Sequence, residues 1–284
     1  MKLFLLTALT MVAFAANSLL NRVAVDRFGM DPVQFAVVRV IAGAVMLLAL
    51  LAWRGPVRPL GHPAARLAGA LALATYMLGF SLAYLTLSAG LGALILFGGV
   101  QIALFAVAVG QGQAVPPRRA AGALVAFAGL VLLLWPGAQT PVHWGGAAAM
   151  LVAAAGWAAY TVLGQREANP LAASAGNFLL CVPLVALALL LPNSGVPGGP
   201  GVALAIVAGA VTSGLGYALW YRILPALPTT VAAVAQLSVP VIAVAAGVAL
   251  LGEPLTGRLV TAGALVLGGI ALSLVQRRIG SSGS

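Results

Sequence analysis

Long apolar stretches alternate along the chain with short segments that carry nearly all of its charged residues. Each stretch has about 17–25 residues, enough for a helix to cross the roughly 30 Å hydrocarbon core of a bilayer. Leu, Ala, Val and Gly dominate the stretches, without the alternation of apolar and polar positions that is typical of membrane β-strands. The pattern predicts an all-α integral membrane protein with ten transmembrane helices, at residues 3–20, 34–53, 67–87, 91–110, 119–135, 144–164, 171–191, 201–221, 226–250 and 256–276.

The charges support a membrane topology rather than a nucleic-acid partner. Charged residues make up 6% of the chain, against about 25% in soluble domains. If the N-terminus is cytoplasmic, only Arg22, Arg27 and Arg258 fall outside, and Arg39 lies within a span. The other basic residues then lie on the cytoplasmic side, at Lys2, Arg54, Arg58, Arg66, Arg118, Arg119, Arg166, Arg222, Arg277 and Arg278. This positive-inside bias predicts cytoplasmic termini. The richness in Arg, Ala and Gly indicates a GC-rich bacterial genome, so the expected location is the bacterial inner membrane.

The second half of the chain repeats the first at an offset of about 137 residues. TYMLGFSLAYLTL at 75–87 aligns with TSGLGYALWYRIL at 212–224. AFAANSLL at 13–20 aligns with GWAAYTVL at 156–163, which favours a first span over a cleaved signal peptide. Further pairs at nearly the same offset are Pro117 with Pro254 and Asp31-Pro32 with Asn169-Pro170. We therefore expect two five-helix repeats, 1–137 and 138–276, followed by a cytoplasmic tail, 277–284, whose GSSGS resembles a linker.

Five spans are an odd number, so the second repeat must enter the membrane from the opposite side to the first. Many secondary transporters use such inverted repeats, which surround a central path and open it alternately to the two sides. The prediction is a transporter that works by alternating access. A different class also fits the pattern: a structural or lipid-handling membrane protein whose intramembrane polar residues only join helices.

Several motifs resemble the drug/metabolite transporter superfamily, and within it the EamA-type exporters. They are AFAANSLLNR in the first span, Pro32 and Arg39 in the second, and LGEPLT after the ninth. The first repeat departs from the pattern, with GQGQAVPPR where the second has LLGEPLTGR. The chain is most similar to the YddG-type exporters of aromatic amino acids. The resemblance implies export of neutral amino acids, aromatic ones included; a broad-specificity metabolite or drug exporter is the alternative.

Polar and aromatic residues near the middle of the spans are the candidate substrate contacts, because an unpartnered polar group in hydrocarbon is costly. Some of them occupy related places in the two repeats: Gln101 aligns with Ser238, Asn17 with Tyr160, and Arg39 with Asn177. Helix-to-helix hydrogen bonding, or bonding of a hydroxyl back to its own helix, is the alternative role. The predicted substrate-binding residues are Asn17, Tyr76, Gln101, Trp157, Tyr160, Asn177, Gln236 and Ser238.

Two further residues have other predicted roles. Pro240 removes the backbone hydrogen bond to the carbonyl near Gln236, so the ninth span is expected to bend there and act as a gate, the alternative being a kink that only improves packing. Arg39 is expected either to serve structurally, reaching the outer headgroups or a carbonyl, or to bind a substrate carboxylate. Tyr84, Trp53 and Trp144 lie at span ends and are predicted to be interface anchors.

The predicted spans lack acidic residues and histidines near their middle, and this limits the possible mechanisms. Asp26, Asp31, Glu167 and Glu253 fall at span ends or in loops, as do both histidines, so no proton relay, metal site or catalytic group is predicted within the membrane. We expect no enzyme activity, no cofactor and no disulfide, since Cys181 is the one cysteine. Transport by uncoupled facilitated diffusion is the predicted mechanism, and coupling to sodium through backbone carbonyls stays open. The sequence leaves the oligomeric state open, with a monomer as one possibility.

Overall fold

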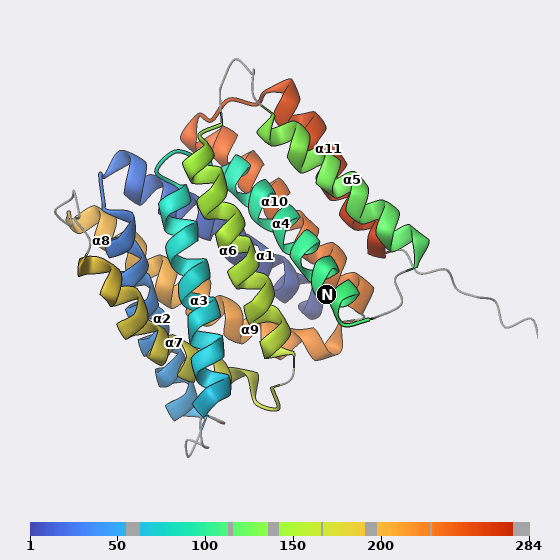
Figure 1. Ribbon diagram of the computed structural model, residues 1–284. Helices are drawn as coiled ribbons and strands as arrows, with labels where there is room; N and C mark the ends of the chain where they lie inside the picture. Colours follow the sequence, from blue (N-terminus) through green and yellow to red (C-terminus); the bar gives the residue numbers. More distant parts are fainter. Residues whose placement is uncertain are drawn as a thin grey trace, which may run out of the picture.

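The computed structural model describes residues 1–54, 63–112, 116–135, 142–165, 167–190, 198–227 and 229–274. In these residues the chain forms helices and no strands, and the helices make up ten spans (Figure 1). The first five spans are α1 Lys2–Arg22, α2 Pro32–Trp53, α3 Pro63–Ala83, α4 Ala89–Gly110 and α5 Pro117–Leu134. The next two are α6 Trp144–Gly164 and α7 Pro170–Ala186. The eighth combines α8 Gly199–Val207, η3 Ala208–Leu215 and α9 Gly216–Ile223; the last two are α10 Thr229–Leu251 and α11 Gly257–Leu274.

The ten predicted spans are confirmed, and most of their ends differ by only a few residues. Nine of the described helices are long and apolar enough to cross a membrane, and α10 adds a shorter apolar segment, Ala235–Leu251. The π-helical turn η1, Val23–Arg27, extends α1, and the 3-10 turns η2, Leu187–Leu190, and η4, Leu224–Ala226, follow α7 and α9. The chain is therefore an all-helical membrane protein.

Polar residues next to prolines fix where several helices begin. The carboxylate of Asp31 accepts hydrogen bonds from the backbone nitrogens of Val33 (2.8 Å) and Gln34 (3.1 Å), and Pro32 is the first residue of α2. Asn169 caps α7 in the same way through the nitrogen of Ala172 (3.2 Å), next to Pro170. Such caps satisfy amide groups that have no partner inside the helix, and proline is well suited to the first helical turn. The two aligned pairs of the repeat thus start corresponding helices.

Small residues allow the central helices to pack closely. A Cβ atom at Gly156 of α6 would lie 2.7 Å from the backbone nitrogen of Tyr76 and 2.8 Å from the carbonyl oxygen of Ala72, both on α3. Gly79 of α3 makes the reciprocal approach to the carbonyl oxygen of Ala149 on α6. Helices in membranes associate through such close backbone contacts, because the surrounding lipid is as apolar as their side chains. The α3–α6 pair forms the centre of the molecule, whereas α5 and α11 pack on each other at one edge (Figure 1).

The glutamate of the LGEPLT motif connects the second half of the chain to the first. The Glu253 carboxylate, just after α10, accepts hydrogen bonds from the backbone nitrogens of Ala89 (2.5 Å) and Gly90 (3.2 Å) at the start of α4. A carboxylate is favourable there, because a helix N-terminus carries free N–H groups and a partial positive charge. In the first repeat the aligned position is Pro116, which has no such group. The motif therefore joins the two halves at the start of α4.

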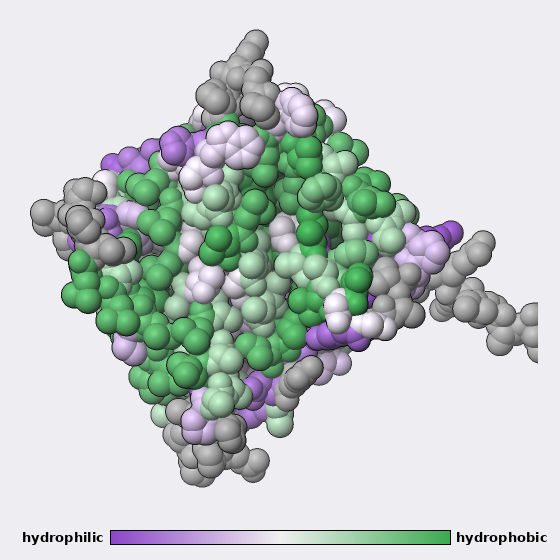
Figure 2. All heavy atoms as spheres, viewed as in Figure 1, coloured by the Kyte–Doolittle hydropathy of each residue, from purple (hydrophilic) through white to green (hydrophobic). Residues whose placement is uncertain are grey.

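The outer surface matches a lipid environment, with one correction to the predicted interface anchors. Figure 2 shows apolar side chains across the middle of one face and polar ones gathered toward two opposite edges. Trp53 and Trp144, at span ends, are 84% and 60% exposed, as an interface position requires. Tyr84 is 0% exposed, so its prediction as an anchor is wrong. Its ring packs edge-on against Phe80, with centroids 4.9 Å apart.

Gly156→Ala is expected to destabilise the protein, because the added methyl group would clash with the backbone of α3. Overpacking costs about 1–3 kcal/mol, so the midpoint of thermal unfolding in detergent should fall by several degrees. Gly268→Ala is the matched control, since a Cβ at that position of α11 would meet nothing within 4 Å. Equal unfolding midpoints for the two variants would contradict the close packing of α3 on α6.

Candidate substrate-binding site

A guanidinium group lies buried between spans from the two halves of the chain. Arg39 of α2 is 0% exposed. Its Nε donates to the hydroxyl oxygen of Ser213 in η3 (3.1 Å), and its Nη2 donates to the hydroxyl of Tyr76 in α3 (3.3 Å). The guanidinium carbon lies 5.1 Å from the ring centroid of Phe80 and 5.6 Å from that of Tyr76. The expectation that Arg39 reaches the outer headgroups is therefore wrong.

The π-helical turn η3 brings two hydroxyl groups to this guanidinium. The hydroxyl of Thr212 lies 2.6 Å from Oδ1 of Asn17, and that of Ser213 lies 3.4 Å from the same atom. Turns of π-helix inside longer helices are frequent at functional sites, because they widen the helix and redirect side chains. Gly209 in the same turn lets η3 approach α2, since a Cβ there would lie 2.7 Å from that of Ala42. The turn links α1 to Arg39 through Asn17.

Thr212 and Ser213 were not among the predicted site residues, although the alignment of the two repeats pairs Ser213 with a predicted site residue. In the alignment of 75–87 with 212–224, Ser213 occupies the place of Tyr76, and these two residues both accept a hydrogen bond from Arg39. Serine and threonine are so common in membrane helices, where they bond to their own backbone, that composition alone did not single them out.

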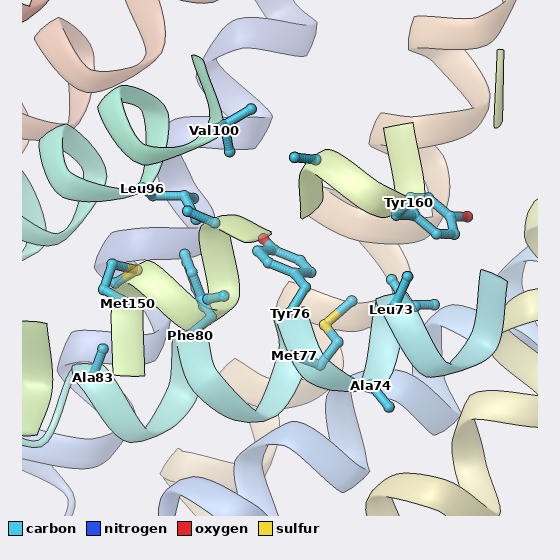
Figure 3. Packing of buried hydrophobic residues seen from close by; sticks show 14 of the residues in the cluster. Leu73, Ala74, Tyr76, Met77, Phe80, Ala83, Leu96, Val100, Met150 and Tyr160 are labelled. Atoms are coloured by element: carbon cyan, nitrogen blue, oxygen red, sulfur yellow. The ribbon is translucent and has the colours of Figure 1, made fainter. Parts of the chain in front are cut away.

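Aromatic rings from five spans form a connected cluster, and two of them, Tyr76 and Phe80, lie against the guanidinium. Trp157 of α6 lies between the rings of Tyr76 (5.0 Å between centroids), Tyr160 (5.7 Å) and Tyr217 of α9 (5.3 Å). Figure 3 shows Tyr76 and Phe80 on successive turns of α3, with the Tyr76 ring between α3 and the helices that carry Val100 and Tyr160. The cluster also includes Phe14 of α1 and Phe178 of α7, each within 6 Å of the Tyr217 ring, centroid to centroid. Tyr217 was missed, but it aligns with Phe80 at the repeat offset.

A second polar cluster lies near the start of α3, at the end of the molecule that the charge pattern assigns to the cytoplasm. Arg66 is 4% exposed, forms an ion pair with Glu167, and donates through Nη1 to Oδ1 of Asn177 (3.2 Å). The hydroxyl of Tyr160 donates to Ser174 (3.4 Å) close by. The cavity that these residues line, together with Gly69 and Tyr221, measures about 10 Å³, roughly the room for one water molecule. The cluster fills this end of the molecule next to Tyr160 of the aromatic cluster.

Three of the predicted residues lie in other surroundings. Gln101 lines a cavity of about 20 Å³ between α4, α5 and α11, with Arg119 and Ser273. Gln236 is half-buried on α10, and the hydroxyl of Ser238 donates to the carbonyl of Ala235 (2.6 Å), the local bonding that was the alternative to substrate contact. In the described part of the chain, no hydrogen bond joins these residues to Arg39. Their role as substrate contacts stays a prediction.

The gating role of Pro240 likewise stays a prediction. The helix α10 continues through Pro240 from Thr229 to Leu251. Pro240 is buried and lines an apolar groove of about 340 Å³ with residues of α11, among them Leu259 and Gly263. The proline therefore borders a packing groove between the last two spans, on helices that lie beside α4.

Comparisons with known proteins agree with this fold. Residues 144–275 match the model of the EamA-like transporter family. An uncharacterized protein of Pseudomonas aeruginosa, PA1977, is 46% identical over 274 residues, covering 96% of this chain and 94% of the relative. A solved chain described only as "Crystal structure of protein" has a TM-score of 0.67 at 22% identity, over 94% of each chain; identity this low shows a shared fold alone. The fold is that of a multi-pass membrane protein. The second half of the chain, residues 144–275, belongs to the EamA-like transporter family.

Replacing Glu167 by Gln is expected to open the end of the site that the Arg66 pair closes. The change leaves the buried charge of Arg66 without its partner. Because Glu167 keeps 24% of its side chain exposed, we expect the loss of the ion pair to cost roughly 1–2 kcal/mol, less than the loss of a fully buried pair. In a Cys181→Ala background, the cysteine introduced by Ser174→Cys should then react about tenfold faster with a membrane-impermeant maleimide.

Asp26→Asn is the matched control, since it breaks the more exposed ion pair with Arg22 at the opposite end of the molecule. It should leave the labelling rate at Ser174→Cys unchanged. A folded Glu167→Gln variant with the rate of the parent protein would show that the ion pair does not limit access.

Proposed function

We propose that the protein exports neutral amino acids, aromatic ones included, across the bacterial inner membrane by alternating access and without ion coupling. The observation that carries the proposal is the buried Arg39 guanidinium, which lies against two rings of an aromatic cluster built from both halves of the chain. A cation beside apolar ring faces suits a small molecule that has a carboxylate and an apolar or aromatic side chain. Asn17, Tyr76, Trp157 and Tyr160 are the predicted contacts that lie in or against this cluster.

The pattern of helix contacts supports two inverted five-helix repeats, 1–137 and 138–276. If the two repeats are equivalent, replacing each span in a contact by its counterpart in the other repeat, five spans away, should give another contact. The observed contacts between spans occur in such pairs. The packing of α3 on α6 has its counterpart in α1 on η3 and α9, and that of α4 on α6 in α1 on α10. The packing of α2 on the eighth span corresponds to that of α3 on α7. A path between two such halves can open alternately to each side.

The position of the acidic residues supports transport without proton coupling. All four lie at helix ends or between helices, where each carboxylate has a structural partner. Asp26 and Glu167 form ion pairs, while Asp31 and Glu253 accept hydrogen bonds from the backbone at helix starts. A proton relay normally uses a carboxylate within the membrane. Solute would then move down its own gradient, outward when its cytoplasmic concentration is high.

One observation favours the lipid-handling alternative. A groove of about 670 Å³ between α4, α5 and α6 is lined almost wholly by apolar side chains, with Trp135 and Trp144 at one end. Its position among membrane spans would suit an acyl chain. The same reconstituted protein separates the two functions, because a lipid-handling protein gives no saturable flux of a water-soluble solute.

Liposomes that contain the purified protein are expected to take up labelled phenylalanine, threonine and methionine saturably, with equal rates in the presence and absence of a pH gradient. A panel of unrelated metabolites and drugs, tested in the same vesicles, distinguishes an amino-acid exporter from a broad-specificity exporter. Accumulation against the solute gradient, driven by protons, would contradict the uncoupled mechanism. Flux no greater than in empty liposomes would contradict amino-acid transport.

Tyr76→Ala is expected to lower phenylalanine flux roughly tenfold, since it removes both an aromatic contact and a hydrogen-bond acceptor of Arg39, together worth about 1.4 kcal/mol or more. Gln236→Ala is also expected to lower flux if α10 lines the path. Thr75→Ala is the matched control, because Thr75 is exposed and its hydroxyl donates to the carbonyl of Leu71 (2.9 Å). Parental rates in the folded Tyr76 and Gln236 variants would remove these residues from the path.

A further inference from the structure

We propose that the central site selects its substrate by the carboxylate group and does not require the amine. The substrate class would then extend from amino acids to N-acylated amino acids and 2-oxo acids that have an apolar or aromatic side chain. Amines and amino-acid amides without a carboxylate would be excluded. This inference rests on the proposed transport function and refines its substrate class.

The first step in the argument is the free hydrogen-bonding capacity of Arg39. A guanidinium has five N–H groups and stays protonated in proteins. Two of the five donate, from Nε to Ser213 and from Nη2 to Tyr76. Nη1 is buried and has no hydrogen-bond partner among the described residues. The free end of the guanidinium, formed by Nη1 and the second N–H of Nη2, has the geometry that binds a carboxylate with two parallel hydrogen bonds.

The second step is the lack of a counter-charge. The chain has four Asp and Glu residues, all within the described residues. Two form ion pairs with Arg22 and Arg66, and the other two accept backbone hydrogen bonds at the starts of α2 and α4. None of them pairs with Arg39 in the described part of the chain. A buried charge without a partner is strongly unfavourable, so a substrate carboxylate would supply the charge that the protein lacks.

The third step concerns the amine. An ammonium group next to Arg39 would be repelled by the like charge, and the described residues around the guanidinium offer it only neutral hydroxyl groups and ring faces. Oδ1 of Asn17, the nearby amide oxygen, is already occupied by Thr212 and Ser213. The rings of Phe80, Tyr76 and Trp157 are better suited to an apolar side chain. Arg39 is 0% exposed in this structure, so substrate reaches it only when the surrounding spans move apart.

The test is competition against labelled phenylalanine in liposomes, with four unlabelled compounds of similar size. N-acetylphenylalanine and phenylpyruvate keep the carboxylate and lack the free amine, whereas phenylalaninamide and phenethylamine keep the amine and lack the carboxylate. We expect the first two to compete within about tenfold of phenylalanine and the last two to compete at least about tenfold more weakly. Equal competition by the amines would overturn carboxylate selection and leave phenylalanine transport intact.

Variants of Arg39 test whether this residue provides the selectivity for carboxylates. Arg39→Gln should abolish the preference for carboxylates, and Arg39→Lys should weaken phenylalanine competition, because lysine keeps the charge but loses the paired N–H groups. Arg258→Gln is the control: Arg258, at the end of the molecule opposite Arg66, donates to backbone carbonyls of Leu132 and Trp135 and should leave the panel unchanged. An unchanged preference in a folded Arg39→Gln variant would overturn the assignment.

A binding measurement separates failure of this inference from failure of the proposed function. The unfolding temperature of the detergent-purified wild-type protein is measured with each compound, which requires neither transport nor a folded variant. A rise with the carboxylates alone supports the inference even if phenylalanine is not transported. A rise with the amines as well, or no rise with any compound, would overturn it.

Discussion

Arg39 holds a positive charge that is fully buried and that pairs with none of the described Asp and Glu residues, and much of the surrounding structure meets that constraint. Two hydroxyl groups accept from its guanidinium, and the faces of two aromatic rings lie close to its carbon. These neutral groups reduce the cost of burying the charge, but they do not neutralise it. The site is therefore incomplete by itself, which is the state expected of a binding site that awaits an anionic group.

The close packing of small residues places the groups around this cation. Gly209 allows the π-helical turn to come against α2, and this turn presents Ser213 to the guanidinium. Gly156 allows α6 to lie directly on α3, which brings Trp157 to Tyr76. In a membrane such contacts are a main source of association between helices. The glycines that stabilise the fold are thus the same ones that assemble the site.

The two ends of the molecule are held by different interactions. At one end Arg66 forms an ion pair with Glu167 and a hydrogen bond with Asn177, next to Tyr160 of the aromatic cluster. At the other, the Glu253 carboxylate binds the start of α4, and the aligned position in the first repeat is Pro116. In alternating access the two ends open in turn. Under the alternating access that we propose, the free energies of opening the two ends need not be equal, because an ion pair and a helix cap respond differently to movement of the spans.

Hydropathy alone determined the number, type and approximate ends of the spans, because a helix must offer about twenty apolar residues to cross the hydrocarbon. Proline with an adjacent Asp or Asn marked the starts of α2 and α7. The aromatic and polar residues near mid-span included Tyr76, Trp157, Tyr160 and Asn17, which the structure brings into or against one cluster. These residues were recognisable because burying them without partners in lipid is costly.

Only the tertiary structure decided which way each helix faces. Lipid and protein interior are equally apolar, so a membrane helix has no polar side that points to solvent and the sequence does not mark its inward face. For this reason Tyr84 was expected at the interface but is buried, and Gln101 lines a separate small cavity. The pairing of Arg66 with Glu167 joins residues far apart in the chain. The burial of Arg39 likewise depends on η3, a segment 174 residues further along, which the packing of the two halves brings to it.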